Sequence, residues 1–243
     1  MKSFLSILIF FAFFIDVNAA NTKLKKYENY SNQITWKGID INLPKGEWMY
    51  FSRETDSLQN FNLGCVRFLN IRNMRIDGSL SACYVTSGGK WRQALGAELK
   101  NEWQNNKYDS CNLRPEYFYV KALFKGASSN CFISRHIDPN KELYFPDDPT
   151  YTSSRGLKKY IKDKSITLPK IMLVFSSFYY SNKRDKAMTM SLDINPEAYG
   201  AKETLFQTEE SSEYHRGNIN NHHLKKKFFE EWTKIMSIEH SVL

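Results

Sequence analysis

The sequence predicts an α+β fold, with helices packed on one face of a mostly antiparallel sheet in a single domain. Several short segments alternate apolar and polar residues with a period of two, which is typical of strands with one buried face. Elsewhere apolar residues recur every three to four positions, as in a helix that packs one side against a sheet. A length of 243 residues fits one hydrophobic core.

The first 19 residues have the organisation of a secretory signal peptide. Lys2 precedes an apolar run over residues 4–15, and a short cleavage-site segment ends at Ala19. The run is shorter than the ~20 residues that cross a bilayer, so an uncleaved anchor is the weaker alternative. We therefore expect an exported protein, periplasmic or secreted, with no later transmembrane span. Residues 20–33 are expected to be a flexible lead-in, and residues 34–243 the α+β domain.

The first half of that domain predicts strands followed by one helix. Alternating patterns indicate strands at residues 34–43, 47–52, 62–71 and 80–86. The dipeptide Asp77-Gly78 predicts the turn between the last two. The pattern then changes period, because apolar residues fall four apart between positions 90 and 105. A helix is expected there, with one apolar stripe formed by Trp91, Leu95, Leu99 and Trp103.

The second half predicts a central hairpin between two helices. Strands are expected near residues 117–123 and 131–136, and a helix at 153–164 with Leu157, Tyr160 and Ile161 facing inward. The apolar run from residue 171 to 180 predicts a strand covered on both faces, and residues 188–194 alternate, so this hairpin should form the centre of the sheet. A last helix over residues 224–236 should bury Leu224, Phe228, Trp232, Ile235 and Met236.

Four cysteines follow the signal peptide, which favours two disulfides in an oxidising compartment. Three pairings are possible. The sequential one is preferred, because each pair brackets a predicted hairpin: Cys65 with Cys83, and Cys111 with Cys131. A zinc site is the competing hypothesis, but the spacings contain no Cys-x-x-Cys pair.

The chain has 34 basic and 26 acidic residues, a formal net charge of +8. Such a balance could serve an anionic partner, such as nucleic acid, an acidic glycan, a cell-wall polymer or lipid headgroups. The basic residues are nevertheless spread along the chain and interleaved with Glu and Asp. That distribution is more typical of a surface that only confers solubility.

No catalytic motif is complete, and we expect no cofactor or metal. The alternative site combines His215 and His222, in and beside a polar loop at residues 207–221, with Asp193 and Glu197 of the preceding turn. Neutral imidazoles with carboxylates can bind a transition metal or act as a general base. The simpler interpretation is a structural turn followed by a polar surface loop.

Two turns and a late tryptophan resemble features of other chains. They are the turn Leu43–Trp48 (LPKGEW), the turn Asn195–Gly200 (NPEAYG) and Trp232 in the last helix. In these the chain resembles a loosely defined group of uncharacterised secreted bacterial proteins. The element order is also similar to the α+β sandwiches of PsbP-like and Mog1-like proteins, which include exported members without catalytic activity. These resemblances imply no particular activity or site residue.

These patterns together predict a non-enzymatic exported protein that serves as a binding or assembly accessory in the cell envelope. Its partner would be another envelope protein or an anionic cell-wall polymer. The alternative is an envelope hydrolase or metal-dependent enzyme that acts through the region from His215 to His223.

The signal peptide gives the first testable prediction. Cleavage is expected after Ala19 or Ala20, because small residues follow the apolar run there. N-terminal sequencing of the exported protein should therefore find no trace of the first 19 residues. An exported chain that still begins at Met1 would contradict this prediction.

Overall fold

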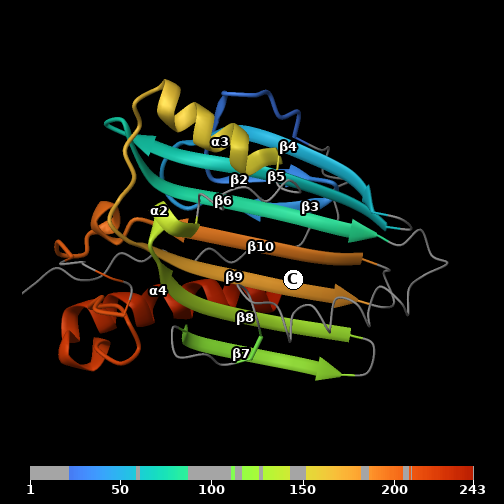
Figure 1. Ribbon diagram of the computed structural model, residues 1–243. Helices are drawn as coiled ribbons and strands as arrows, with labels where there is room; N and C mark the ends of the chain where they lie inside the picture. The colour runs from blue at the N-terminus through green and yellow to red at the C-terminus, as the bar shows by residue number, and fades with distance from the viewer. Residues whose placement is uncertain are drawn as a thin grey trace, which may run out of the picture.

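The computed structural model contains one 8-stranded antiparallel sheet with the order β1-β4-β5-β6-β10-β9-β8-β7 (Figure 1). The hairpin of β9 and β10 lies inside this sheet between β6 and β8, as the sequence predicts. The structure describes residues 22–58, 61–86, 111–112, 117–125, 128–142, 152–181, 186–204, 208 and 210–242. The predicted signal peptide and the helix predicted at 90–105 lie outside these residues.

The strands are β1 (Asn29–Tyr30), β2 (Gln33–Trp36), β3 (Ile39–Asn42), β4 (Trp48–Leu58), β5 (Phe61–Arg72), β6 (Arg75–Thr86), β7 (Tyr117–Lys125), β8 (Ser128–Ile137), β9 (Met172–Ser181) and β10 (Lys186–Ile194). The helices are α2 (Pro139–Glu142), α3 (Thr152–Asp163) and α4 (His223–Val242), with short 3-10 helices η1 (Pro196–Tyr199) and η2 (Ile219–Asn221). Strands β2 and β3 form a separate two-stranded sheet.

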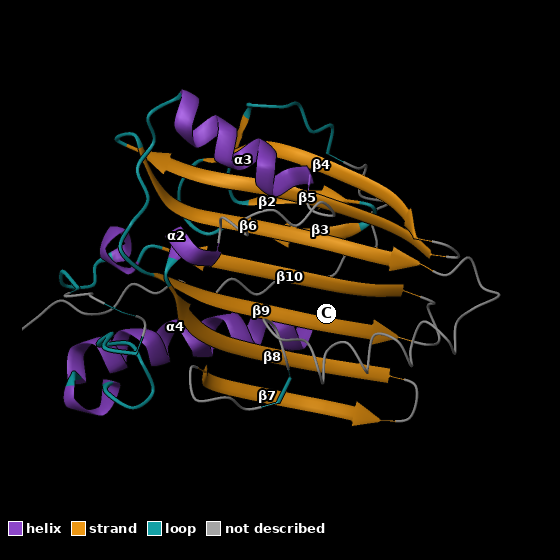
Figure 2. Ribbon diagram, viewed as in Figure 1, coloured by secondary structure: helices purple, strands orange, loops and turns teal. Residues whose placement is uncertain are grey.

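The prediction of an α+β fold with helices on one face is wrong. Strands contain about twice as many described residues as helices, so the protein is better described as mostly β. The two long helices also lie on opposite faces of the sheet. Along β9, Val174 packs in the cluster that contains Leu157 of α3, whereas Phe175 packs with Phe229 of α4. Because successive strand residues point to opposite faces, α3 and α4 cover different sides (Figure 2).

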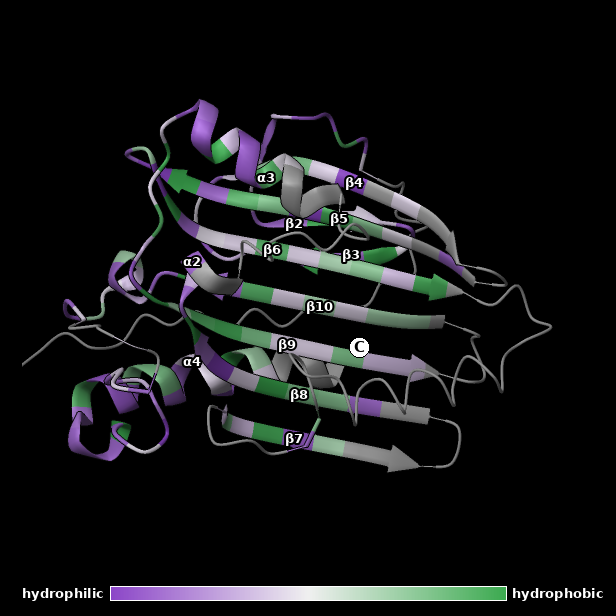
Figure 3. Ribbon diagram, in the orientation of Figure 1, coloured by the Kyte–Doolittle hydropathy of each residue, from purple (hydrophilic) through white to green (hydrophobic). Residues whose placement is uncertain are grey.

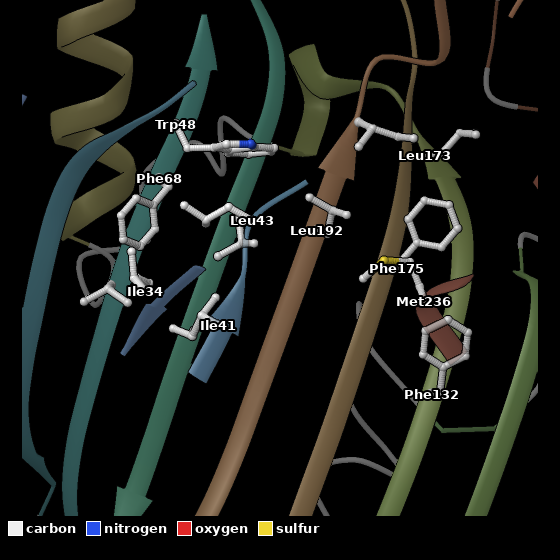
Figure 4. Packing of buried hydrophobic residues seen from close by; sticks show 14 of the residues in the cluster. Ile34, Ile41, Leu43, Trp48, Phe68, Phe132, Leu173, Phe175, Leu192 and Met236 are labelled. Atoms are coloured by element: carbon white, nitrogen blue, oxygen red, sulfur yellow. The ribbon is translucent and has the colours of Figure 1, made fainter. Parts of the chain in front are cut away.

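The α4 side of the sheet is covered by two elements. In Figure 4, Ile34 and Ile41 of the β2–β3 hairpin lie near Phe68 of β5, while Met236 of α4 lies near Phe175 of β9. The hairpin corrects a second prediction, since residues 34–43 were expected to form one strand. Its turn is Lys37-Gly38, where φ is 54° and 72°. These left-handed angles suit a two-residue hairpin turn and explain why the apolar positions change parity between Trp36 and Ile39.

Both disulfides have the sequential pairing that the sequence favoured. Cys65 and Cys83 are directly opposite each other on β5 and β6, and Cys111 is joined to Cys131 of β8. Two disulfides are characteristic of chains that mature in an oxidising compartment, which supports export. Among the helices that the structure describes, none has both the length and the apolar character of a membrane span.

The predicted turn at Asp77-Gly78 is instead a β-bulge. The β5–β6 hairpin reverses at Asn73 and Met74, where φ is 50° and 57°. Gly78 pairs with Asn70 and Ile76 pairs with Ile71, which leaves Asp77 as the extra residue on β6. The prediction failed because it placed a carboxylate outside the sheet, whereas Asp77 is buried at 2% exposure.

Two arginines and an asparagine compensate the buried Asp77 carboxylate. Arg72 and Arg75 approach it through their Nε atoms at 2.8 and 2.9 Å, and Asn195 Nδ2 donates to it at 3.1 Å. Asn195 Oδ1 also accepts the backbone N–H of Glu197 at 3.2 Å. Asp77 thus fixes the NPEAYG turn to the β5–β6 hairpin. The neighbouring Tyr199 lies beneath the Arg72 guanidinium. Burial raises the pKa of the Tyr199 phenol to about 12, so this phenol stays neutral.

Helix α4 confirms the predicted stripe in part: Met236 is buried and Phe228 and Trp232 pack against the core, but the other two predicted residues do not. Leu224 and Ile235 are 57% and 53% exposed. The buried stripe is Lys225, Phe229, Thr233 and Met236. The prediction failed at Leu224 and Ile235 because it assigned the polar residues, Lys225 among them, to the solvent side. Thr233 Oγ1 in fact donates to buried Ser134 Oγ at 3.1 Å, and the partners of Lys225 are described below.

A pair of substitutions tests this helix orientation. Phe229 is fully buried against Phe118, Phe175 and Tyr214, so Phe229→Ala should lower the free energy of unfolding by about 3–5 kcal/mol. Ile235→Ala on the exposed side should change it by less than about 0.5 kcal/mol. Urea denaturation without reductant measures both. Similar losses for the two variants would contradict the orientation.

Candidate functional site

The chain before α4 brings one of the predicted histidines against a carboxylate. His222 Nδ1 lies 3.2 Å from Glu213 Oε1, and the Lys225 ammonium forms an ion pair with Glu213 Oε2. Lys225 Nζ also donates to the backbone carbonyl of Glu203 at 2.8 Å and to Thr204 Oγ1 at 3.3 Å. An ammonium group has three donors, so these acceptors use all of them.

This arrangement fastens Glu203, Thr204 and Glu213 to the first turn of α4. Lys225 is 7% exposed, and a buried ammonium is tolerated only when a carboxylate and further acceptors replace its water shell. The same ammonium lies 5.7 Å from the ring of Tyr214. Burial raises the pKa of the Tyr214 phenol above its usual range, so that side chain also stays neutral.

Of the other predicted site residues, Glu197 borders this cluster through Thr204, whereas His215 and Asp193 have other contacts. His215 Nδ1 accepts the backbone N–H of Gly217 at 3.1 Å, and its ring lies edge-on to buried His136 with centroids 5.7 Å apart. Glu197 accepts the backbone N–H of Thr204 at 3.0 Å. Asp193 follows Leu192, which packs on the α4 side, so Asp193 points to the α3 side of the sheet.

The structure therefore separates Asp193 from the rest of the predicted set and gives His215 and His222 different partners, while Glu197 borders the His222–Glu213–Lys225 cluster through Thr204. Within the described residues, no group of three or more His, Cys, Asp or Glu side chains is placed to hold a metal ion. The contacts of Lys225 and Glu213 explain why polar residues cluster in this part of the sequence.

Removing the Lys225 ammonium tests this structural role. Lys225→Met should lower the free energy of unfolding by about 2 kcal/mol, because it leaves the partly buried Glu213 carboxylate without its cation. This loss of stability is smaller than for a fully buried pair, because the Glu213 side chain is 18% exposed and its contact with His222 remains. Lys227→Met, at an exposed position on α4, is the matched control. Equal urea midpoints for the two variants would contradict the role of Lys225.

A second surface joins two segments that are far apart in the sequence. Tyr27 stacks on Tyr160 of α3, with ring centroids 5.6 Å apart and planes 14° apart. Phe51 of β4 contacts both rings, at 6.2 and 5.2 Å. Within residues 22–30, Tyr27 therefore lies against α3, whereas Leu24 and Tyr30 pack with the cluster on the α4 side. We name the exposed lysines of these two segments, with the two tyrosines, the basic corner: Lys23, Lys25, Lys26, Lys158, Lys159, Lys162 and Lys164.

The basic corner concentrates most of the net charge of the protein. The seven lysines of the basic corner share their segments with two acidic residues, an excess of five positive charges where the whole chain has eight. Each acidic residue faces a lysine: Glu28 lies 2.9 Å from Lys25 Nζ, and Asp163 lies 3.7 Å from Lys159 Nζ. Hydrophilic residues predominate along α3 and the chain beside it (Figure 3).

Sequence reasoning missed this surface because it considered basic residues only along the chain. One signal could have indicated it. The tripeptide Lys-Lys-Tyr occurs at 25–27 and again at 158–160, and its two tyrosines are the ones that stack. Compared with models of protein families, with curated proteins and with solved structures, the chain matches none.

Proposed function

We propose that the protein is a non-enzymatic exported binding protein of the cell envelope, and that its basic corner holds an anionic envelope polymer. The observation that carries this proposal is the excess of five positive charges on two segments that meet at the Tyr27–Tyr160 pair. The two disulfides support a compartment in which envelope polymers are available.

A polymer suits this surface better than a small anion. All seven lysines of the basic corner are exposed, and an exposed ion pair contributes only about 0.2–1 kcal/mol. One small anion could contact only a few of these side chains and would bind weakly. A polyanion can contact several lysines at once along both segments, so that weak contacts add up to a useful affinity.

The histidine region supports a structural role in place of a catalytic one. The donors of Lys225 are taken by three acceptors, and Glu213 is shared between Lys225 and His222. Asp193 of the predicted set lies on the other side of the sheet, so it is not placed to orient a histidine of this region.

Charge reversal tests the proposal with a matched control. The double variant Lys26→Glu/Lys162→Glu should bind an acidic polymer, such as polygalacturonate, about thirtyfold more weakly. This estimate assumes about 1 kcal/mol for each lysine, with 1.4 kcal/mol as a factor of ten. Affinity should be measured by isothermal titration at low ionic strength and should fall as salt is added.

The control is Lys202→Glu/Lys227→Glu, which changes the net charge equally at exposed positions outside the basic corner. It should weaken binding by about threefold at most, since only the overall charge of the protein changes. Equal losses in the two double variants would overturn the proposal and indicate a surface that only confers solubility. Thermal melts of both variants check that the fold is retained.

A further inference from the structure

We infer that the anionic polymer of the basic corner is an acidic polysaccharide, whose sugar rings stack on the Tyr27–Tyr160 pair. This inference rests on the proposed function and specifies its ligand. The charges of the basic corner would attract any polyanion, whereas the two tyrosines add a flat apolar surface that only a ring-containing polymer can use.

Tyr27 is exposed and supported from below. Its side chain is 50% exposed, and it lies on the ring of Tyr160. Tyr160 is held in turn by an edge contact with Phe51, and its hydroxyl donates to Met49 Sδ at 3.7 Å. The upper ring therefore rests on a packed base, and an incoming ring would not have to order it.

The backbone of Tyr27 adds an independent observation. Its φ of 67° lies in the left-handed region, which bulky side chains rarely adopt and which Gly or Asn would occupy with less strain. Hydrogen bonds on both sides hold this turn: the Tyr27 N–H donates to the carbonyl of Tyr50 at 2.8 Å, and the Glu28 N–H to that of Lys25 at 3.0 Å. A half-exposed tyrosine at a strained position suggests a role for its ring outside the core.

The cations next to the ring match a sugar that carries a carboxylate. Lys26 Nζ lies over the Tyr27 ring at 5.0 Å from its centroid and over the Phe51 ring at 6.0 Å, so an incoming sugar ring has to displace this ammonium to the side. A uronic acid ring that stacks on Tyr27 would bring its carboxylate within reach of this ammonium, which stands at the end of a flexible side chain. Hydrogen bonding with Glu28 raises the pKa of Lys25, so that neighbour also remains charged.

Two other classes of polyanion fit less well. Polyphosphate and polyol phosphates carry charge without rings, and they would leave the tyrosine pair unused. Nucleic acid has rings, but the two disulfides point to a compartment outside the cytoplasm, where acidic polysaccharides are the ring-bearing polyanions of the envelope.

The test replaces Tyr27 without disturbing its turn. Asn tolerates a positive φ, so Tyr27→Asn removes the ring and keeps the backbone. Affinity is measured for polygalacturonate, for polyphosphate and for single-stranded DNA at one ionic strength. Tyr27→Asn should weaken polygalacturonate binding about fivefold, the lower end of what one stacked aromatic contributes, and change polyphosphate binding by less than about twofold. The control Tyr119→Asn, at an exposed tyrosine on β7, should change neither.

The outcomes separate this inference from the proposed function. One outcome is that Tyr27→Asn weakens the binding of all three polymers equally, or of none, while Lys26→Glu/Lys162→Glu still weakens their binding. In that case the identification of the ligand as a polysaccharide is wrong and the anion-binding function stands. The identification of the ligand as a polysaccharide would also be overturned if the wild-type protein bound DNA more tightly than polygalacturonate and Tyr27→Asn removed this preference. If the lysine variant behaves like its control, both proposals fail.

Discussion

The strand β9 must bury both of its faces, and the rest of the structure follows from this constraint. Met172 and Val174 point to one side, and Leu173 and Phe175 to the other, and all four are almost fully buried. Burying each of these side chains stabilises the fold by roughly 1.5–3 kcal/mol, but only if another element covers its side of the sheet. Helix α3 provides one cover, and α4 with the β2–β3 hairpin provides the other.

The cover on the α4 side depends on buried polar contacts as well as apolar ones. Lys225 at the start of α4 is fixed by Glu213 and Thr204, and Thr233 further along is fixed by Ser134. Such contacts add little net stability, because burying the groups costs almost as much as the contacts return. They do make other rotations of the helix costly, since a rotated helix would leave an ammonium buried without acceptors.

The parts of the fold that could be predicted depend on local pattern. Alternation located β5 and β10, a continuous apolar run located β9, and helical spacing located α3 with its inward Leu157 and Ile161. Apart from the local turn at Lys37-Gly38, the errors share one physical cause, which is that a residue was judged without its distant partners. Asp77 appeared to be a turn residue because Arg72, Arg75 and Asn195 were not known to surround it.

The same cause explains the two larger misses. A helical stripe shows that one side of a helix is buried, but it does not show which face of the sheet receives it, so the placement of α3 and α4 could not be derived. The candidate site was missed because its two halves are about 130 residues apart in the sequence. Once α3 covers its face of the sheet, its polar side must face solvent beside the segment that carries Tyr27. The packing that buries β9 thereby creates the basic corner, and the lysines of this corner lie outside the core that positions them.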